Sequence, residues 1–210
     1  KSDNQITGFN PGAMKYASEY RFDGLDPAAA LAIVAPGNLE DMLLYSRFYK
    51  QVGLRYIFDP GQSIPAWGSG ELKEMATGAL ALIVNDYELE MYRQKTGLGE
   101  ADLLELTPQV LTTRGDQGSV VQTNSGREEI PAVPARQVMD PTGAGDAYRA
   151  GLLLGLALSL NWTEAARLGA VLASFCVEKQ GTQEHRLEIT EFWDRYTSNF
   201  GPPPEAALKR

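Results

Sequence analysis

The sequence predicts an α/β fold, in which helices cover both faces of a mainly parallel sheet and a small antiparallel part is added. Short apolar runs bounded by Gly, Pro, Asn or Asp alternate with longer segments whose apolar residues recur at helical spacing. A late glycine-rich turn, residues 140–146, leads into an apolar helical segment. Because alternating strands and helices build parallel sheets, ligands are expected at the edge where the strands end.

Four apolar runs are expected to form the parallel strands, and two further runs the antiparallel addition. The parallel strands are expected at residues 31–35, 55–58, 79–84 and 110–113, and the antiparallel pair at 119–122 and 129–130. The turn residues 123–126 between the last two runs indicate a hairpin. Ile6 and Phe9 suit one more short strand, before the turn at Asn10-Pro11-Gly12.

The segments between the strands carry helical periodicity and helix-end signals. Asn38 is a candidate N-cap for the first helix, and Gly181 lies where a C-cap would end a late one. Helices are expected at residues 39–53, around 72–75, around 88, at 150–160, 161–179 and 188–196. One domain over residues 1–200 is predicted, followed by a poorly ordered tail at 201–210 that starts with a proline run.

Composition and charge exclude several classes of protein. With 210 residues, of which 43% are hydrophobic and 22% charged, the chain is long enough for one good core. Lys and Arg number 19 and Asp and Glu 27, so the net charge of −8 argues against nucleic-acid or anionic-membrane surfaces. No apolar run reaches the about 18 residues of a membrane span, and no signal peptide is recognised. The single cysteine fits a reducing cytoplasm, so a cytoplasmic location is expected.

The turn at residues 140–146 has the chemistry of an anion site. Gly143 and Gly145 let the backbone approach a ligand closely, and the first N–H groups of a helix have no internal partner. Asp146 would compete with an anion unless it has its own task, such as taking a proton from a hydroxyl that attacks a phosphoryl group. The alternative is structural: the turn is only a turn, and the carboxylate only complements the helix dipole.

The string DPTGAGDAYRAG at residues 140–151 resembles the signature of the ribokinase-like, or PfkB, family of sugar and nucleoside kinases. The family pattern is D-T-x-G-A-G-D-x-F, and this chain has Pro at the second position and Tyr for the final Phe. The resemblance implies a ribokinase-like fold with Asp146 as the catalytic base. It also implies that the N–H groups of Gly143, Ala144 and Gly145 hold the transferring phosphoryl group.

Two more strings resemble motifs of the same family. Asn85-Asp86-Tyr87-Glu88 resembles N-x-x-E, which implies that Asn85 lies near the phosphates and that Glu88 orients Mg²⁺ through water. The alternative is an Asn cap followed by a solvated Glu. The run 113–118 resembles the T-x-G-x-x-G loop, which implies nucleotide contacts from its members Thr113, Arg114, Gly115 and Gly118. An exposed turn arginine is the alternative for Arg114.

Weaker resemblances extend the predicted site. Asp59-Pro60-Gly61-Gln62 resembles the family's D-P-x-x loop, from which only a phosphate-side position for Asp59 is carried over. Ala173 and Val177 match the adenine-side wall, although core packing explains them equally well. Family members often hold a monovalent cation such as K⁺ beside the anion hole, and Asp140 and Thr142 match that place.

The function expected from this resemblance is ATP-dependent phosphorylation of a sugar or nucleoside hydroxyl by a monomer or homodimer. The strings NQITGF, PGAM and FDPGQ resemble the nucleoside-kinase branch, so an adenosine-like acceptor is favoured over ribose or a hexose. The family's N-terminal strands, Gly-Gly acceptor motif and most of its lid are not recognised, which keeps a catalytically idle nucleotide-binding module as an alternative. A dinucleotide-binding dehydrogenase is disfavoured because no early G-x-G-x-x-G follows a strand.

Overall fold

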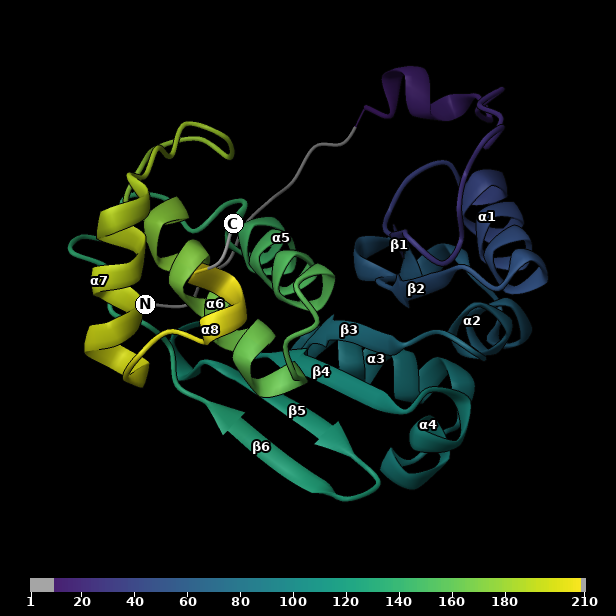
Figure 1. Cartoon of the computed structure of the whole chain (residues 1–210). Helices are drawn as coiled ribbons and strands as arrows, with labels where there is room; N and C mark the ends of the chain where they lie inside the picture. The colour runs from purple at the N-terminus through teal and green to yellow at the C-terminus, as the bar shows by residue number, and fades with distance from the viewer. Residues whose placement is uncertain (1–9, 209–210) are drawn as a thin grey trace.

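The centre of the molecule is a mixed sheet whose strands follow one another in sequence order from β1 to β6 (Figure 1). The structure is a computed structural model that describes residues 10–208. Strands β1 to β4 are parallel, and β5 and β6 extend β4 as an antiparallel hairpin. The strands are β1 (Leu31–Val34), β2 (Arg55–Phe58), β3 (Ala81–Asn85), β4 (Gln109–Thr113), β5 (Ser119–Thr123) and β6 (Gly126–Ile130). The predicted α/β fold with its antiparallel addition is confirmed, while the strand expected around Ile6 and Phe9 lies outside the described residues.

Helices cover both faces of this sheet (Figure 1). On one face lie α1 (Leu39–Val52), α2 (Ser69–Ala76), α3 (Asp86–Thr96) and α4 (Glu100–Leu106). On the other lie α5 (Ala144–Ala157), α6 (Trp162–Cys176), α7 (Ile189–Phe200) and the short α8 (Glu205–Leu208). Three single-turn to double-turn 3-10 helices lie in the connections, at Gly12–Lys15, Gly61–Ala66 and Gly115–Gln117.

The helices differ from the expectation at several places: α5 begins at Ala144 rather than residue 150, and α7 ends at Phe200 rather than residue 196. α4 was not predicted; it is short, and the Asp102 carboxylate caps it by accepting the Gly99 N–H at 2.7 Å. α6 ends at Cys176 rather than near residue 179, because the Val177 carbonyl accepts the N–H groups of Met139 and Asp140 instead of continuing the helix. The expected disordered tail contains α8, which buries Ala207 against the α5–α7 core.

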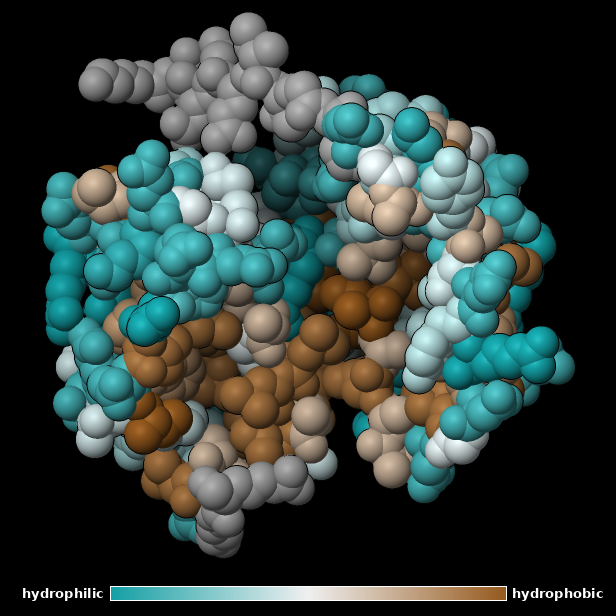
Figure 2. All heavy atoms as spheres, turned by 90° about the horizontal axis from the view of Figure 1, so that it is seen from above, coloured by the Kyte–Doolittle hydropathy of each residue, from teal (hydrophilic) through white to brown (hydrophobic). Residues whose placement is uncertain are grey.

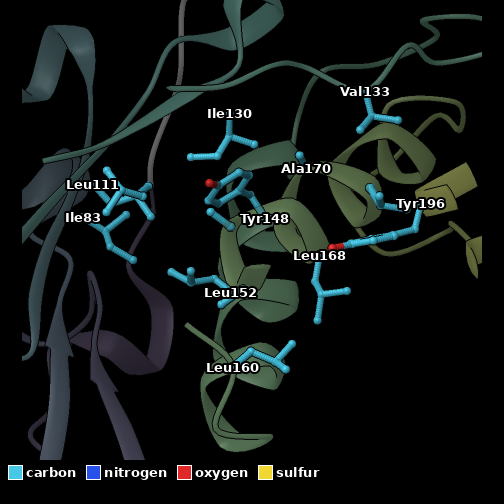
Figure 3. Packing of buried hydrophobic residues seen from close by; sticks show 14 of the residues in the cluster. Ile83, Leu111, Ile130, Val133, Tyr148, Leu152, Leu160, Leu168, Ala170 and Tyr196 are labelled. Carbon is cyan, nitrogen blue, oxygen red and sulfur yellow. The ribbon is translucent and has the colours of Figure 1, made fainter. Parts of the chain in front are cut away.

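Side chains alternate between the two faces of the sheet along each strand, so the core consists of two clusters, one on each face. On β3, Ala81 and Ile83 face α5 and α6, whereas Leu82 and Val84 face α1 to α4. Figure 3 shows the first cluster, in which side chains of the sheet (Ile83, Leu111, Ile130) meet those of α5 and α6 (Tyr148, Leu152, Leu168). Both faces of β3 are therefore buried, as its continuous apolar sequence predicts.

Glycines allow α5 and α6 to pack backbone against backbone. A Cβ on Gly151 would lie 2.7 Å from the Leu168 carbonyl oxygen, and one on Gly169 would lie 2.6 Å from the Tyr148 carbonyl oxygen. Gly155 makes an equally close approach to Ala165. Because no side chain fits between the two helices, the direction of α5, and with it the position of its N-terminus, is fixed by this contact.

The two edges of the sheet differ in chemistry. β6 carries the exposed charged residues Arg127, Glu128 and Glu129, which discourage further strand pairing. β1 is apolar and half-buried, and within residues 10–208 it pairs only with β2. Seen from above, hydrophobic side chains gather in a hollow between the α5–α6 side and the β1–α1 side (Figure 2). No helix in the described part of the chain is long and apolar enough to cross a membrane.

Candidate functional site

Predicted site residues meet where the parallel strands end. Asp59 directly follows β2, and its N–H donates to the Val34 carbonyl at the end of β1. Asn85 and Thr113 are the last residues of β3 and β4 and are register partners across the sheet. The expectation that these groups share one edge therefore holds for the described structure, although their roles stay predictions.

The glycine-rich turn ends at the first turn of α5. Gly143 is the N-cap of the helix in the left-handed region, with φ of 85°, and a Cβ there would lie 3.0 Å from the Thr182 carbonyl oxygen. Within residues 10–208, the Ala144 N–H donates to the Pro141 carbonyl, whereas those of Gly143 and Gly145 have no hydrogen-bond partner. Two such amides and the helix dipole are the groups that an anion would need at this position.

Asp146 lies in this first turn of α5 and is accessible, with 88% of its side chain exposed. One turn further along, the guanidinium of Arg149 lies 3.9 Å from the Asp146 carboxylate and forms an ion pair with Asp59. Asp59 is buried, and its Oδ1 accepts from Nη2 of Arg149 at 3.0 Å. One arginine thus joins the end of β2 to the predicted catalytic helix.

Burial dominates the electrostatics of Asp59. Desolvation raises the pKa of this carboxyl from 3.8 to about 6, although the charge and hydrogen bond of Arg149 act in the opposite direction. The negative charges of Glu88 and Asp146 raise the pKa of Asp59 further. Asp59, Glu88, Asp146 and Arg149 therefore form one electrostatically coupled group at this edge of the sheet.

Asn85 and Glu88 form a capping box at the start of α3. The Glu88 N–H donates to Asn85 Oδ1 at 2.7 Å, and the Asn85 N–H donates to Glu88 Oε2 at 2.8 Å. The helix cap that the sequence offered as the structural alternative is thus present in the fold. Within residues 10–208, Glu88 Oε1 has no hydrogen-bond partner and is available for a second interaction. No group of three or more His, Cys, Asp or Glu side chains in residues 10–208 forms a direct metal cage. The side-chain oxygens of Asn85 and Glu88 fit a Mg²⁺ ion that is held mainly through water and substrate oxygens.

The loop after β4 has the backbone that its glycines require. Gly118 has φ of 81°, and a Cβ there would collide with the Ile130 carbonyl oxygen, so only glycine fits. Gly115, with φ of 57°, faces open space. The Arg114 N–H closes the loop by donating to the Gly118 carbonyl, while its guanidinium lies 3.8 Å from Glu129 on β6. The side chain of Arg114 therefore extends along the hairpin.

Asp140 fixes the start of the glycine-rich turn. Its carboxylate accepts the N–H groups of Thr142 at 2.9 Å and Gly181 at 3.1 Å. The Thr142 side chain, followed by these two N–H groups, holds the pKa of Asp140 below its usual value. The carbonyl oxygens of Thr142 and Thr182 both contact Cys176 Sγ, at 3.8 and 4.0 Å. Two carbonyls thus converge beside the turn, on one of the positions predicted for a monovalent cation. Burial raises the pKa of the Cys176 thiol, which suits a core residue better than a nucleophile.

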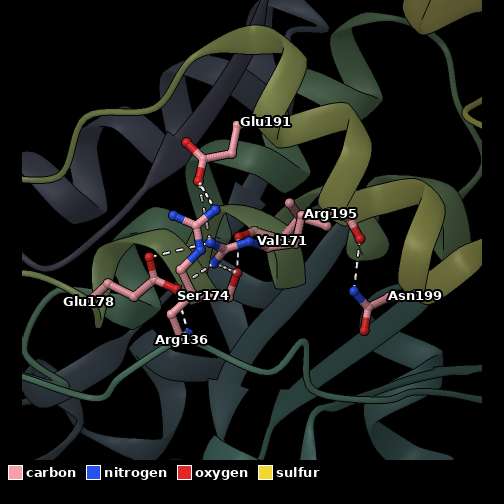
Figure 4. Close-up of polar contacts among 7 residues, drawn as sticks. All are labelled: Arg136, Val171, Ser174, Glu178, Glu191, Arg195 and Asn199. Carbon is pink, nitrogen blue, oxygen red and sulfur yellow. Dashed lines mark hydrogen bonds and ion pairs between the residues drawn. The ribbon is translucent and has the colours of Figure 1, made fainter.

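The segment that precedes the turn is anchored by an ion network on α6 and α7 (Figure 4). Arg195 donates to Glu178 at 2.8 Å and lies 3.6 Å from the Phe175 ring, while Arg136 pairs with Glu191 at 2.5 Å. The Arg136 N–H also donates to Glu178. Of the two predicted adenine-wall residues, Ala173 packs partly against the core, and the Val177 carbonyl binds the strand-like segment at Met139.

Two features of the site were not predicted from the sequence. One is Arg149. The only signal for it in the sequence is its position three residues after Asp146 on a predicted helix, a spacing that makes two side chains neighbours. The other is Tyr148, which stands where the family pattern has Phe. Its hydroxyl makes a 2.7 Å hydrogen bond with Ser119, which is fully buried on β5. The extra oxygen thus ties α5 to the antiparallel hairpin.

The fold agrees with the comparisons with known proteins. The pfkB family of carbohydrate kinases matches residues 4–189, and the chain belongs to this family. It is 34% identical over 184 residues to a nucleoside kinase of Methanocaldococcus jannaschii, which covers 87% of this chain and 60% of that protein. A nucleoside kinase of Methanothermobacter thermautotrophicus is 30% identical over 204 residues, covering 96% of this chain and 65% of that protein.

A solved structure gives the same result. Burkholderia thailandensis nucleoside kinase in complex with inosine matches with a TM-score of 0.80 at 36% identity, covering 83% of this chain and 57% of that one. The resemblance to the nucleoside-kinase branch is thereby confirmed. The chain spans less than two thirds of the length of these relatives.

Proposed function

We propose that this chain carries the phosphoryl-transfer site of an ATP-dependent kinase that acts on a nucleoside hydroxyl. The observation that carries the proposal is the first turn of α5, where an accessible carboxylate, Asp146, lies beside the unpartnered amides of Gly143 and Gly145. A base next to an anion site is the arrangement that phosphoryl transfer to a hydroxyl needs. Membership of the pfkB family supports the same reaction class.

In this proposal each residue has a separate task. Asp146 accepts the proton of the attacking hydroxyl, and the Gly143 and Gly145 amides stabilise charge on the transferring group. The Ala144 N–H stays hydrogen-bonded to the Pro141 carbonyl within the turn, so in this proposal it does not bind the phosphoryl group. Bound Mg²⁺ would supply charge neutralisation at the phosphates, with the free oxygen of Glu88 orienting its waters.

The nucleotide is proposed to lie along the strand ends. Asn85 would lie near the phosphates, and Thr113, Gly115 and Gly118 would present the loop after β4 to the nucleotide. Ala173 and Val177 would border the adenine. A K⁺ ion beside the turn would use backbone carbonyls near Asp140 and Thr142, where the Thr142 carbonyl already points toward Cys176.

A nucleoside is proposed as the acceptor because of the relatives. The two curated relatives described above carry the name nucleoside kinase, and the Burkholderia kinase was solved with inosine and with ADP-inosine. The FDPGQ string, whose Asp59 forms the buried pair with Arg149, resembles that branch. On these grounds we propose ribose and hexoses only as less favoured acceptors than nucleosides.

A second candidate is a nucleotide-binding module without catalysis. It is supported by length, since the chain spans 57–65% of the relatives described above. The apolar hollow in Figure 2 and the unpaired edge of β1 are surfaces that a further segment would cover. Without that coverage the acceptor would lack fixed geometry beside Asp146.

An ATP-turnover screen separates the two candidates. The chain would be assayed with Mg²⁺ and K⁺ against inosine, adenosine, ribose and fructose, beside Asp146→Asn and the control Asp194→Asn, an exposed change on α7. We expect turnover with a nucleoside that falls by about two to four orders of magnitude in Asp146→Asn and stays unchanged in the control. ATP binding without turnover would support the module. Undiminished turnover in Asp146→Asn would refute the proposed base.

A further inference from the structure

A cavity of about 290 Å³ lies on the face of the sheet opposite α5. Its floor includes Val110 of β4 and Val120 of β5, and its walls come from α3 and α4. The neighbouring strand residues Leu111 and Val121 face the α5–α6 core instead. The cavity is therefore separated from the Asp146 site by the thickness of the sheet.

Three arginines from separate elements line this cavity. Arg93 comes from α3, Arg114 from the loop after β4, and Arg127 from β6. Arg114 and Arg127 share one carboxylate, Glu129, at 3.8 and 3.2 Å. Among the residues that the structure describes, Arg93 has no carboxylate within 4.0 Å. Arg93 is therefore the arginine of this cavity that lacks a close counter-charge in the described structure.

Two of these arginines have unsatisfied donors. The Nε atoms of Arg93 and Arg114 are buried and have no hydrogen-bond partner in the described structure. A buried guanidinium N–H without an acceptor is costly, and native proteins normally provide one. An anion between the guanidinium groups of Arg93 and Arg114 would give both arginines a charged partner.

The remaining lining limits the kind of anion. Leu89, Leu103 and the two floor valines are apolar, so the body of the ligand is expected to be apolar or a flat ring. The carboxylates in the lining, Asp86, Glu90 and Glu100, are all exposed and solvated at the rim. Arg93 and Arg114 are half-buried, whereas Arg127 is exposed.

We propose that this cavity binds a small organic phosphate monoester. The phosphoryl group lies between Arg93 and Arg114, which match its several acceptor oxygens, with Arg127 adding charge from β6. The organic body covers Val110 and Val120. No residue of its lining belongs to the start of α5, and Arg114 is the member that it shares with the loop proposed to contact the nucleotide.

Calorimetric titration of the intact chain with phenyl phosphate tests this proposal. The variants are Arg93→Gln and, as a matched control, Arg47→Gln, which removes an exposed arginine paired with Glu74 on α2. We expect one saturable site that weakens at least about tenfold in Arg93→Gln and is unchanged in Arg47→Gln, because a charged hydrogen bond is lost. Binding that is absent, or equal in Arg93→Gln and the unmodified chain, would overturn the proposal.

Two further probes test the ligand chemistry. Inorganic phosphate is expected to bind at least about tenfold more weakly than phenyl phosphate, because it leaves the apolar floor uncovered. Benzoate is expected to bind more weakly as well, since it carries one negative charge. If either probe bound as tightly as phenyl phosphate, the proposal that the ligand is a phosphate monoester would be refuted. The Nε–Hε nuclear magnetic resonance signals of two arginines should move on titration, and signals that stay fixed would contradict the assignment.

Discussion

Arg149 and Asp59 form a buried ion pair across 90 residues of sequence. Nη2 of the guanidinium donates to Oδ1 of Asp59, Nε lies in ion-pair contact with Oδ2, and the group also lies 3.9 Å from Asp146. Since Asp59 directly follows β2 and Arg149 belongs to α5, this pair attaches the helix with the proposed base to the edge of the sheet. The stability of the fold and the position of Asp146 therefore depend on the same contact.

Removing the arginine should destabilise the chain strongly. Arg149→Met leaves Asp59 buried without a partner, and we expect the free energy of unfolding to fall by about 3–5 kcal/mol. Arg47→Met, which breaks an exposed pair with Glu74, should cost at most about 1 kcal/mol. Urea unfolding of both variants checks this, and equal losses would show that the buried pair has no special weight.

The same pair predicts an unusual pH dependence. Because the folded pKa of Asp59 is about 6 and its ordinary value is 3.8, the folded chain keeps a proton that the unfolded chain has released between these values. Stability from this group should therefore decrease as the pH rises from about 4 to about 6, by about 3 kcal/mol in total, and stay constant above that.

Urea unfolding of the unmodified chain and of Asp59→Asn across this pH range measures the effect. The difference in unfolding free energy between them should shrink toward neutral pH. A difference that grows with pH would mean that Arg149 outweighs burial and that the pKa of Asp59 lies below its ordinary value. Removing Arg149 should raise the pKa of Asp59 further, because its charge favours the ionised form.

Glu88 has a structural role that can be separated from its proposed metal role. Glu88→Gln keeps an oxygen for the Asn85 N–H, so stability should change by less than about 0.5 kcal/mol, whereas Glu88→Ala should lose about 1 kcal/mol. The Mg²⁺ concentration needed for half-maximal turnover should rise in both variants. Asn161 and Glu164 form the same capping box on α6, so Glu164→Gln is the matched control and should leave the Mg²⁺ requirement unchanged. An unchanged requirement in Glu88→Gln would leave Glu88 with its capping role alone.

Local patterns in the sequence predicted most of the fold. The strand runs alternate with capped helices, and Asn38 and Asn85 are N-caps in the structure. α4 and α8 were not predicted because each has fewer than two full turns of apolar repeat, and burial against the core stabilises them instead. The importance of Gly143 and Gly118 could be predicted, because a positive φ and a close approach of neighbouring backbone leave few alternatives to glycine.

Long-range partners could not be predicted in this way. Nothing near Asp59 indicates that its partner is Arg149, and nothing near Tyr148 indicates Ser119, because each pair forms only when separate elements pack. The cavity beneath β4 and β5 likewise depends on α3, α4, the loop after β4 and β6, which meet only in the fold. Sequence reasoning placed groups at the edge of the sheet, and packing determined which of them touch.

The Tyr148–Ser119 hydrogen bond yields a prediction that a double-mutant cycle can test. Both oxygens are buried, and burial raises the pKa of the Tyr148 phenol, so the pair stays neutral at any ordinary pH. Tyr148→Phe restores the family pattern but leaves the Ser119 hydroxyl buried without a partner. We expect it to cost about 1–3 kcal/mol of unfolding free energy, and Ser119→Ala to cost a similar amount. The double variant should cost clearly less than the sum of the two, because no unpaired polar group remains. Additive losses in urea unfolding would show that the two hydroxyls do not interact, and that the tyrosine at this position is held by the packing of its ring alone.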